Sequence, residues 1–507
     1  MSSGVGEDRI PVIIGIGEVC DRGTSMDATA LMLASLEAAE RDSGAALLGR
    51  LDWIGVEDEI SFPHEAPQEA LARSLPTVPP LRVKTSEASG DGPIQLINDA
   101  ANLIGKGVIR IAACVGAEAF RTAAQRAKED IAAGREPPKN TLADLALARA
   151  TPLARKFGLL TPIDVYPLYE NAMRAAWGQS LSEAQAETAL IWSRSSEVAA
   201  ANPNAWLRRA VPPEHISGAT ADNRMVGFPY TKMMVANASV NMGAASIVTS
   251  LAAARELGIA ESHIVYVGPG ASAGEVEDFL RRDSFRRLPS LEATIDAALE
   301  FNALRPADID LVELYSCFPC IPKAARRALN WPANRPTSVY GGLTFGGAPM
   351  GNCMMHAVSC MVQKLREGAG INGLIVANGG FATHSHSMVL TRNPVPPGKF
   401  PQIYDVQDSA DALKGPVPNL LDSYEGIGSI ETFAVHFGRD GPRGGVIVGR
   451  TPSGDRFVAS VPKEDKVMLA FLMSEDREPV GSVGEVRLRE GTPVWIGEAH
   501  HAGVGNE

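Results

Sequence analysis

The chain contains 507 residues and carries a formal net charge of −12 at pH 7, with 45% hydrophobic and 21% charged residues. This composition is typical of a globular protein in water, and the length suits two to four domains of roughly 100–200 residues each. No apolar run approaches the roughly 20 residues of a membrane-spanning helix. The excess of acidic residues disfavours a nucleic-acid partner, because phosphate binding needs a basic surface. We therefore expect neither membrane insertion nor nucleic-acid binding.

The N-terminus and the cysteines favour a cytoplasmic protein. Glu7 and Asp8 stand where a secretory signal would need positive charge followed by an apolar run. The six cysteines are scattered, so we expect reduced thiols and no disulfide framework. Cys317 and Cys320 form a CxxC pair, but no second pair with zinc spacing accompanies them, and we expect no metal site.

The first part of the chain alternates between predicted strands and helices. Residues 11–17 form an apolar run with the length of a buried strand, and residues 26–39 follow as an Ala/Leu-rich helix. A strand over 51–56 and a helix over 65–75 come next. This alternation predicts an α/β fold.

An internal repeat indicates that one α/β unit is used twice. Residues 82–118 contain a loop, a helix over about 93–104 and a strand over 108–115. Residues 351–380 follow the same order, with a glycine-containing loop, an amphipathic helix, a short turn, an apolar strand and small residues. We therefore predict two similar halves.

Three dense loops lie between residues 311 and 380, each at a predicted junction of strand and helix. The first, YSCF, follows the strand 311–314, and the second, GGLTFGGAPMGN, precedes a helix over about 352–366. The third, ANGG, follows the strand 374–376. Ligands of open α/β sheets bind at the carboxyl ends of strands, so we expect the functional site here.

The order ELYSCF, GGLTFGGAPMGN and ANGG resembles the catalytic loops of the thiolase superfamily, which read NEAF or HDCF, then GHP, then CxGGG. This resemblance implies a duplicated five-layer fold with two sheets and helices between them. The implied halves are residues 1–250, with a helical insertion at about 121–230 that caps the site, and residues 251–400. Gly243-Ala244-Ala245 is similar to the segment that closes the first thiolase half.

The C-terminal region predicts a separate small domain. A proline-rich linker at 391–402 precedes five short predicted strands and one helix, a pattern typical of an OB-like β-barrel over 420–507. This region resembles the additional C-terminal domain of type 1 thiolase-like proteins. Few aromatic residues are available for base stacking, so we expect the barrel to dock within the chain.

Three substitutions depart from the thiolase pattern. Glu87 occupies the position of the nucleophilic cysteine, Ala348 replaces the histidine of GHP, and Ala377 replaces the cysteine of CxGGG. These changes argue against Claisen condensation and thiolysis, which need an activated thiol. Glu87 is interpreted either as a general base with a raised pKa or as a solvated acid near a helix start.

Other candidates for catalysis come from the first and third loops. Cys317 matches the acid/base cysteine of the sterol-carrier type of thiolase, and its alternative role is a small buried hydrophobe. Tyr315 replaces the histidine of HDCF, as in the similar steroid side-chain aldolases, where a tyrosine moves a proton during retro-aldol cleavage. Asn378 lies in the third loop, and His384 follows it with either an acid/base or a structural role.

Candidates for substrate binding are glycines, a helix start and two cations. The glycines allow close approach of backbone N–H groups to an oxyanion, the helix beginning at Asn352 presents further N–H groups, and the cations suit the phosphates of coenzyme A. Ordinary surface positions are the alternative for the two cations. The binding candidates are Gly346, Gly347, Asn352, Gly379, Gly380, Arg224 and Lys232.

The resemblance implies an acyl-CoA-handling protein, similar to acetyl-CoA acetyltransferases but without standard thiolase chemistry. A coenzyme A thioester is the implied substrate, and no bound cofactor is expected. Two alternatives remain open: a retro-aldol lyase on a β-hydroxyacyl-CoA, with Tyr315 and Glu87 as proton carriers, and a non-catalytic acyl-CoA binder. We expect a homodimer, or a monomer if the C-terminal domain covers the dimer face.

Overall fold

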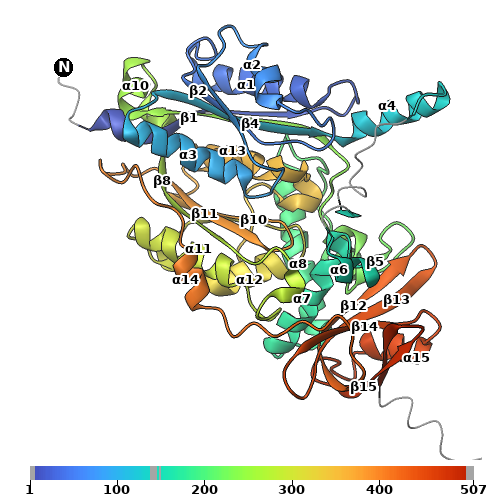
Figure 1. Ribbon diagram of the computed structural model, residues 1–507. Coiled ribbons are helices and arrows are strands. Elements are labelled where there is room, and N and C mark those ends of the chain that lie inside the picture. Colours follow the sequence, from blue (N-terminus) through green and yellow to red (C-terminus); the bar gives the residue numbers. More distant parts are fainter. Residues whose placement is uncertain (1–5, 137–145, 148–149, 498–507) are drawn as a thin grey trace, which may run out of the picture.

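The computed structural model describes residues 6–136, 146–147 and 150–497 (Figure 1). The N-terminal half is built from a sheet and the helices that cover it. Its elements are β1 (Pro11–Cys20), α1 (Ala28–Ser43), β2 (Trp53–Val56), α2 (Pro67–Ala72), β3 (Leu81–Lys84), α3 (Gly92–Lys106), β4 (Ile111–Ala119), β7 (Asn241–Ser250) and α10 (Leu251–Glu256).

The C-terminal half repeats this plan and contributes four strands. Its elements are β8 (Val265–Gly274), α11 (Pro289–Phe301), β9 (Leu311–Leu314), α12 (Cys320–Ala328), α13 (Cys353–Arg366), β10 (Asn372–Gly379), β11 (His384–Thr391) and α14 (Gln407–Ala412). Helix α12 follows the first loop directly, with Pro319 as its N-cap residue.

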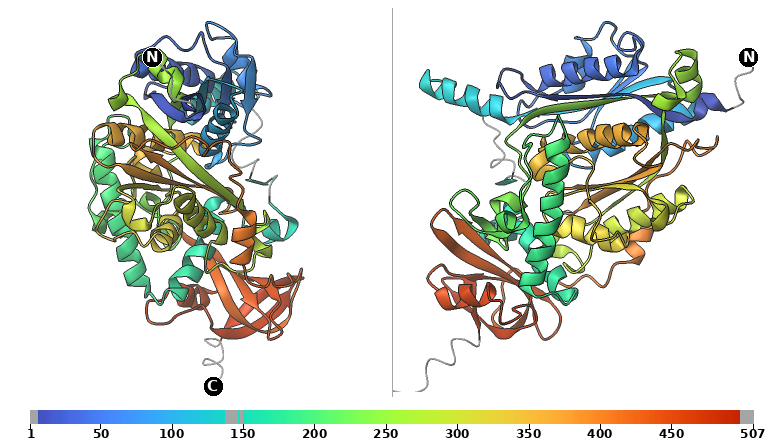
Figure 2. Two further views of the ribbon diagram at one scale, coloured as in Figure 1. Left: turned by 90° about the vertical axis from the view of Figure 1, so that its left-hand side faces the viewer. Right: turned by 180° about the vertical axis from the view of Figure 1, so that it is seen from behind.

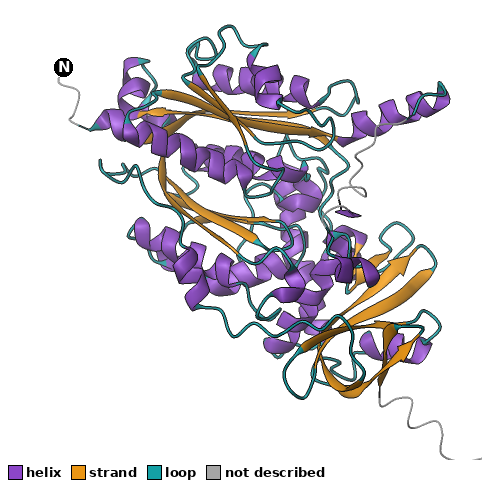
Figure 3. Cartoon of the chain, in the orientation of Figure 1, coloured by secondary structure: helices purple, strands orange, loops and turns teal. Residues whose placement is uncertain are grey.

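The strands of the two halves follow the order β3-β2-β4-β7-β1 and β8-β11-β10-β9. The half-sheets join through β1 and β8, where Val12 pairs with Tyr266 and Ile13 pairs with Val265. Beyond this point they separate, and α3 and α13 lie between them, while α1 and α2 cover one outer face and α11 and α12 the other (Figures 1 and 3). The result is the predicted five-layer, duplicated α/β fold.

The two central helices are buried because they face protein on both sides. In α13 the residues from Cys353 to Val362 are all buried, and in α3 the buried set includes Ile94, Ile97 and Ile104. Such a nearly continuous apolar surface is expected of a helix in the interior of a large domain. Burial of α3 and α13 places their N-termini next to the three loops.

The region between β4 and β7 contains most of the remaining helices. Its elements are α4 (Phe120–Ala132), α6 (Pro152–Lys156), α7 (Pro162–Ala176), α8 (Leu181–Ala201), α9 (Pro213–Ser217), β5 (Met225–Phe228) and β6 (Tyr230–Thr231). Helices α7 and α8 run along the C-terminal half, as Figure 2 shows from two further sides. Lys323 of α12 and Glu170 of α7 form a buried ion pair that ties this region to the C-terminal half.

The C-terminal barrel consists of β12 (Gly426–Gly438), β13 (Gly441–Arg450), β14 (Arg456–Val461), α15 (Lys466–Leu472), β15 (Val483–Arg489) and β16 (Thr492–Gly497). The five strands close because β12 pairs with both β13 and β15. The predicted range 420–507 extends beyond the described residues, which end at 497.

The region expected to be a helical insertion, about 121–230, also contains two short strands at its end, β5 and β6. Strand β5 pairs with β12 through Phe228 and Val435, so the insertion extends the barrel's sheet. The reason is tertiary: Phe228 is buried against Phe433, with 6.2 Å between ring centroids. A four-residue strand is too short to show a period of its own.

No helix in the described part of the chain has both the length and the apolar composition to cross a bilayer.

Candidate functional site

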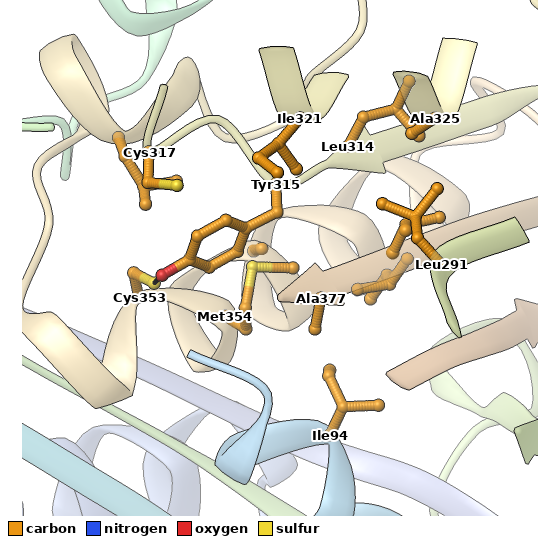
Figure 4. Packing of buried hydrophobic residues seen from close by; sticks show 14 of the residues in the cluster. Ile94, Leu291, Leu314, Tyr315, Cys317, Ile321, Ala325, Cys353, Met354 and Ala377 are labelled. Atoms are coloured by element: carbon orange, nitrogen blue, oxygen red, sulfur yellow. Dashed lines mark hydrogen bonds between the residues drawn. The ribbon is translucent and has the colours of Figure 1, made fainter. Parts of the chain in front are cut away.

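The first and third loops lie side by side because β9 and β10 are parallel neighbours. The N–H of Tyr315 continues the ladder by donating to the carbonyl of Val376 at 3.0 Å. Tyr315 therefore leaves the sheet directly beside Ala377, and its phenol points toward the start of α13 (Figure 4). The carboxyl edge of the C-terminal half thus brings both loops to one place.

The Tyr315 phenol is buried and contacts a thiol. Its oxygen lies 3.7 Å from Sγ of Cys353, the first residue of α13. It also packs directly against Gly90, where a side chain would clash with the phenol and with the Asn378 carbonyl. Burial, followed by the neighbouring Cys353 and Cys317 thiols, raises the pKa of Tyr315 well above its ordinary value. The phenol therefore keeps its proton at neutral pH.

Cys317 lies two residues further on and is also a protonated group. Burial raises the pKa of this thiol to about 12, although a hydrogen bond with Tyr166 lowers it. Tyr166 belongs to α7, and its ring stacks on Phe318 at 4.4 Å between centroids. Sequence reasoning missed Tyr166, because nothing in its local pattern links α7 to a loop about 150 residues away.

The third loop is held by two tyrosines of α7. Asn378 donates from Nδ2 to the Tyr166 oxygen at 3.1 Å, and Tyr166 donates to the Gly380 carbonyl at 3.1 Å. Tyr169 donates to the carbonyl of Phe381 at 2.7 Å. These bonds fix both the side chain and the backbone of the loop.

Gly379 marks the contact between the third loop and the N-terminal half. A side chain there would clash with the Ser89 hydroxyl and the Asp91 carboxylate. The Ser89 hydroxyl in turn donates to Asp91, the N-cap residue of α3. The turn before α3 therefore touches the third loop through bare backbone.

The second loop is anchored by Glu313 of β9. This buried carboxylate accepts hydrogen bonds from the Ser338 hydroxyl at 2.8 Å and from the N–H groups of Val339 and Tyr340 at 2.9 and 3.0 Å. Burial raises the pKa of Glu313 to about 7, against these hydrogen bonds, which lower it. The backbone then turns through Gly341 and Gly347 at φ values of 106° and 112°, which side chains rarely adopt.

Asn352 and Glu57 meet where α3 and α13 begin. Asn352 donates from Nδ2 to the Gly116 carbonyl at 2.5 Å, and its Oδ1 has no partner among the described residues. Glu57 accepts from the Ser89 N–H at 2.8 Å, and its carboxyl group fills the space beside Gly92 and Gly351. Burial raises the pKa of Glu57 well above its usual range, although the Ser89 hydrogen bond opposes this.

Glu57 was also not predicted as a site residue, although its position in the sequence gives a reason to expect it there. It is a carboxylate directly after the apolar strand β2, at the same sheet edge as the other candidates. The same signal drew attention to Tyr315 in the other half. Sequence reasoning gave weight to Glu87 instead, because of its position in the thiolase pattern.

Comparisons with known proteins agree with this architecture. Residues 405–491 match the family model described as thiolase-like protein type 1 additional C-terminal domain. The structure is similar to that of a monomeric SCP2-thiolase-like protein type 1 from Mycobacterium smegmatis, with 26% identity, a TM-score of 0.80, and coverage of 96% of this chain and 99% of that one. The chain has a thiolase-like fold with a type 1 additional C-terminal domain.

More distant structures share the fold alone. Human mitochondrial 3-ketoacyl-CoA thiolase is similar at 14% identity and a TM-score of 0.57, covering 76% of this chain and 99% of that one. The Ltp2-ChsH2(DUF35) aldolase is similar at 17% identity and a TM-score of 0.59, with the same coverage. A comparison with curated protein sequences gives no match.

Within this thiolase-like fold, most of the candidates lie close to the three loops. Tyr315, Cys317, Asn378, Gly379 and Gly380 lie together where the first and third loops meet the turn before α3. Gly346, Gly347 and Asn352 line the adjoining second loop and helix start. Glu87 is on the same turn as Ser89 and is partly exposed.

His384, Arg224 and Lys232 lie at the periphery. His384 is partly exposed, and its Nε2 lies 2.7 Å from a carboxylate oxygen of Glu277. Arg224 and Lys232 are exposed on the β5–β6 hairpin, where the Lys232 N–H donates to the Arg224 carbonyl at 2.9 Å. Neither cation forms an ion pair with the described residues.

His386, the companion of His384 on β11, is fully enclosed. Burial lowers its pKa to about 4, against the nearby Asp91, and its ring lies 5.2 Å from that of Tyr404. His386 is therefore a neutral side chain of the interior. Among the described residues, no three His, Cys, Asp or Glu side chains are arranged to hold a metal ion.

The raised pKa of Cys317 predicts a thiol that does not react at neutral pH. We expect iodoacetamide to leave Cys317 of the native protein unmodified at pH 7.5, because thiolate rather than thiol is the nucleophile. The rate at which iodoacetamide alkylates Cys317 should rise with pH beyond pH 10. Peptide mapping by mass spectrometry measures this, with urea-unfolded protein as the control for a reactive Cys317. Half-maximal labelling of native Cys317 near pH 7 or 8 would contradict the assignment.

Proposed function

We propose that the chain binds coenzyme A thioesters and handles their acyl groups without forming an acyl-enzyme thioester. The observation that carries this proposal is the set of groups where the loops meet: a phenol and two thiols, each with a pKa raised by burial. The position of the thiolase nucleophile holds Glu87 instead. A transferase of the thiolase type needs an activated thiol at that point.

The β5–β6 hairpin supports a place for the phosphates of coenzyme A. Arg224 and Lys232 offer two exposed positive charges next to each other. Four residues after Lys232, the N–H of Ala236 donates to the carbonyl of Cys317 at 3.0 Å. The hairpin therefore leads directly into the first loop, so phosphates on the hairpin and an acyl group at the loops suit one extended ligand.

Binding is tested by calorimetry with acetyl-CoA and with acetyl-pantetheine, which lacks the nucleotide phosphates. We expect acetyl-CoA to bind more tightly, and the variant R224A/K232A to lose about 10-fold or more of that affinity, because a hydrogen bond to a charged group contributes roughly 1.5–3 kcal/mol. Affinity for acetyl-pantetheine should not change. The variant R305A, which removes an exposed cation elsewhere, is the matched control. No detectable acetyl-CoA binding would defeat the proposal.

Retro-aldol cleavage of a β-hydroxyacyl-CoA is a second candidate. The specific observation is Tyr315, a protonated phenol whose oxygen lies 3.7 Å from the Cys353 thiol and against the backbone of Gly90. Cleavage of the Cα–Cβ bond leaves a thioester enolate and a carbonyl compound, after a base takes the hydroxyl proton. In this proposal Tyr315 returns a proton to the enolate carbon, and Glu87 accepts the hydroxyl proton.

The variant Y315F separates the two candidates. If the chain is a lyase, Y315F loses a factor of about 100 or more in cleavage rate, the usual scale of a general acid. Its melting temperature should stay close to that of the native protein, because the ring is kept and only a weak contact with Cys353 is lost. Chromatography of the acyl-CoA products measures the rate. Equal cleavage by Y315F would exclude Tyr315 as the proton carrier.

A further inference from the structure

We propose that the C-terminal barrel positions the third loop of the site, through Arg456, Arg282 and Tyr169. The third loop is defined here as residues 377–383. The barrel holds this loop whether or not the chain binds acyl-CoA. This gives the additional domain a role in the site, from which it is separated along the chain by the linker at 391–402.

The first link of this route joins the barrel to the C-terminal half. Arg456 of β14 is fully buried, and its guanidinium donates to both oxygens of Glu431 at 2.7 and 2.9 Å. The remaining N–H groups leave the barrel and donate to the carbonyls of Leu280 and Arg282 at 2.7 and 2.6 Å. A guanidinium that is paired with a carboxylate and whose N–H groups all have acceptors holds the accepting backbone in a defined geometry.

The second link joins Arg282, in the segment whose carbonyls Arg456 binds, to α7. Arg282 is itself buried, and it donates from Nη1 to the Tyr169 hydroxyl at 2.9 Å. Its guanidinium also lies 4.8 Å from the centroid of the Tyr169 ring. Phe285 packs edge-on against that ring at 5.3 Å and lies under the Arg456 guanidinium at 5.1 Å. Arg456 and Tyr169 are thus connected through two sets of contacts.

The third link reaches the site. The Tyr169 hydroxyl accepts a hydrogen bond from Arg282 and donates one to the Phe381 carbonyl at 2.7 Å. This one hydroxyl therefore connects Arg282 to the third loop. One turn earlier on α7, Tyr166 holds Gly380 and Asn378. Strand β12 of the barrel packs along the same helix, where Thr432 donates to the Leu168 carbonyl at 2.5 Å (Figure 1).

The loop needs such support because its backbone is strained. Ala382 has a φ of 58°, in the left-handed region that is unfavourable for any residue with a side chain. Strained backbone of this kind persists only when surrounding contacts over-determine it. Loss of the Tyr169 bond should therefore allow the loop to open, and the amide of Thr383, which donates to the Gly379 carbonyl at 3.1 Å, reports that opening.

Hydrogen exchange followed by mass spectrometry tests the route with Y169F and R456M. We expect each variant to accelerate exchange at Thr383 by about 5- to 10-fold, the equivalent of one hydrogen bond. The double variant should add little to the larger single effect, because both changes act on one route. Glu431 keeps Arg450 as a partner in R456M, and R456K is a second variant that should exchange at an intermediate rate.

The controls are Y266F, which removes a hydroxyl that bonds Glu261 near the start of β8, and R487M on the surface of β15. Both should leave Thr383 unchanged. A second readout is alkylation of Cys317 at high pH relative to Cys114, which is buried in β4: loop opening should favour Cys317 alone. Unchanged Thr383 exchange in Y169F and R456M, or equal acceleration at Thr383 and throughout β4, would overturn the proposal.

Discussion

The constraint on which the site depends is the contact of bare backbone between the two halves of the fold. Gly90 lies against the Tyr315 phenol. Gly379 lies against Ser89 and Asp91. The carboxyl group of Glu57 fills the space left by Gly92 and Gly351. Side chains at these glycines would separate the turn before α3 from the loops of the C-terminal half. The duplication places two sheet edges face to face, and the glycines let them touch.

This close contact also determines the chemistry that is available. Groups that meet here are withdrawn from water, so burial raises the pKa of Tyr315, Cys317, Glu57 and Glu313 together. Protonated phenols and thiols donate hydrogen bonds and move protons, but they attack thioesters poorly. These groups therefore suit the proposed non-covalent handling of an acyl group better than its covalent transfer.

Much of this architecture could be predicted from the sequence, because it depends on local signals. Apolar runs located the strands, glycine clusters located the loops, and the repeated order of elements indicated the duplication. Tyr166, Glu57 and strand β5 were not predicted, since each gains its role from residues distant in the chain. Tyr166 reaches Gly380 across 214 positions, and β5 owes its existence to the barrel. The protonation states likewise follow from burial, which a single sequence does not display.

The intact mass of the protein after incubation with acetyl-CoA distinguishes non-covalent handling of the acyl group from its covalent transfer. We expect an unchanged mass, because Glu87 stands where the thiolase resemblance implies a nucleophile and the Cys317 thiol is protonated. The same incubation with chemically acetylated protein provides the positive control for detection. An acetyl group found on Cys317, or on any other residue of the three loops, would contradict the claim and make the chain a covalent acyltransferase.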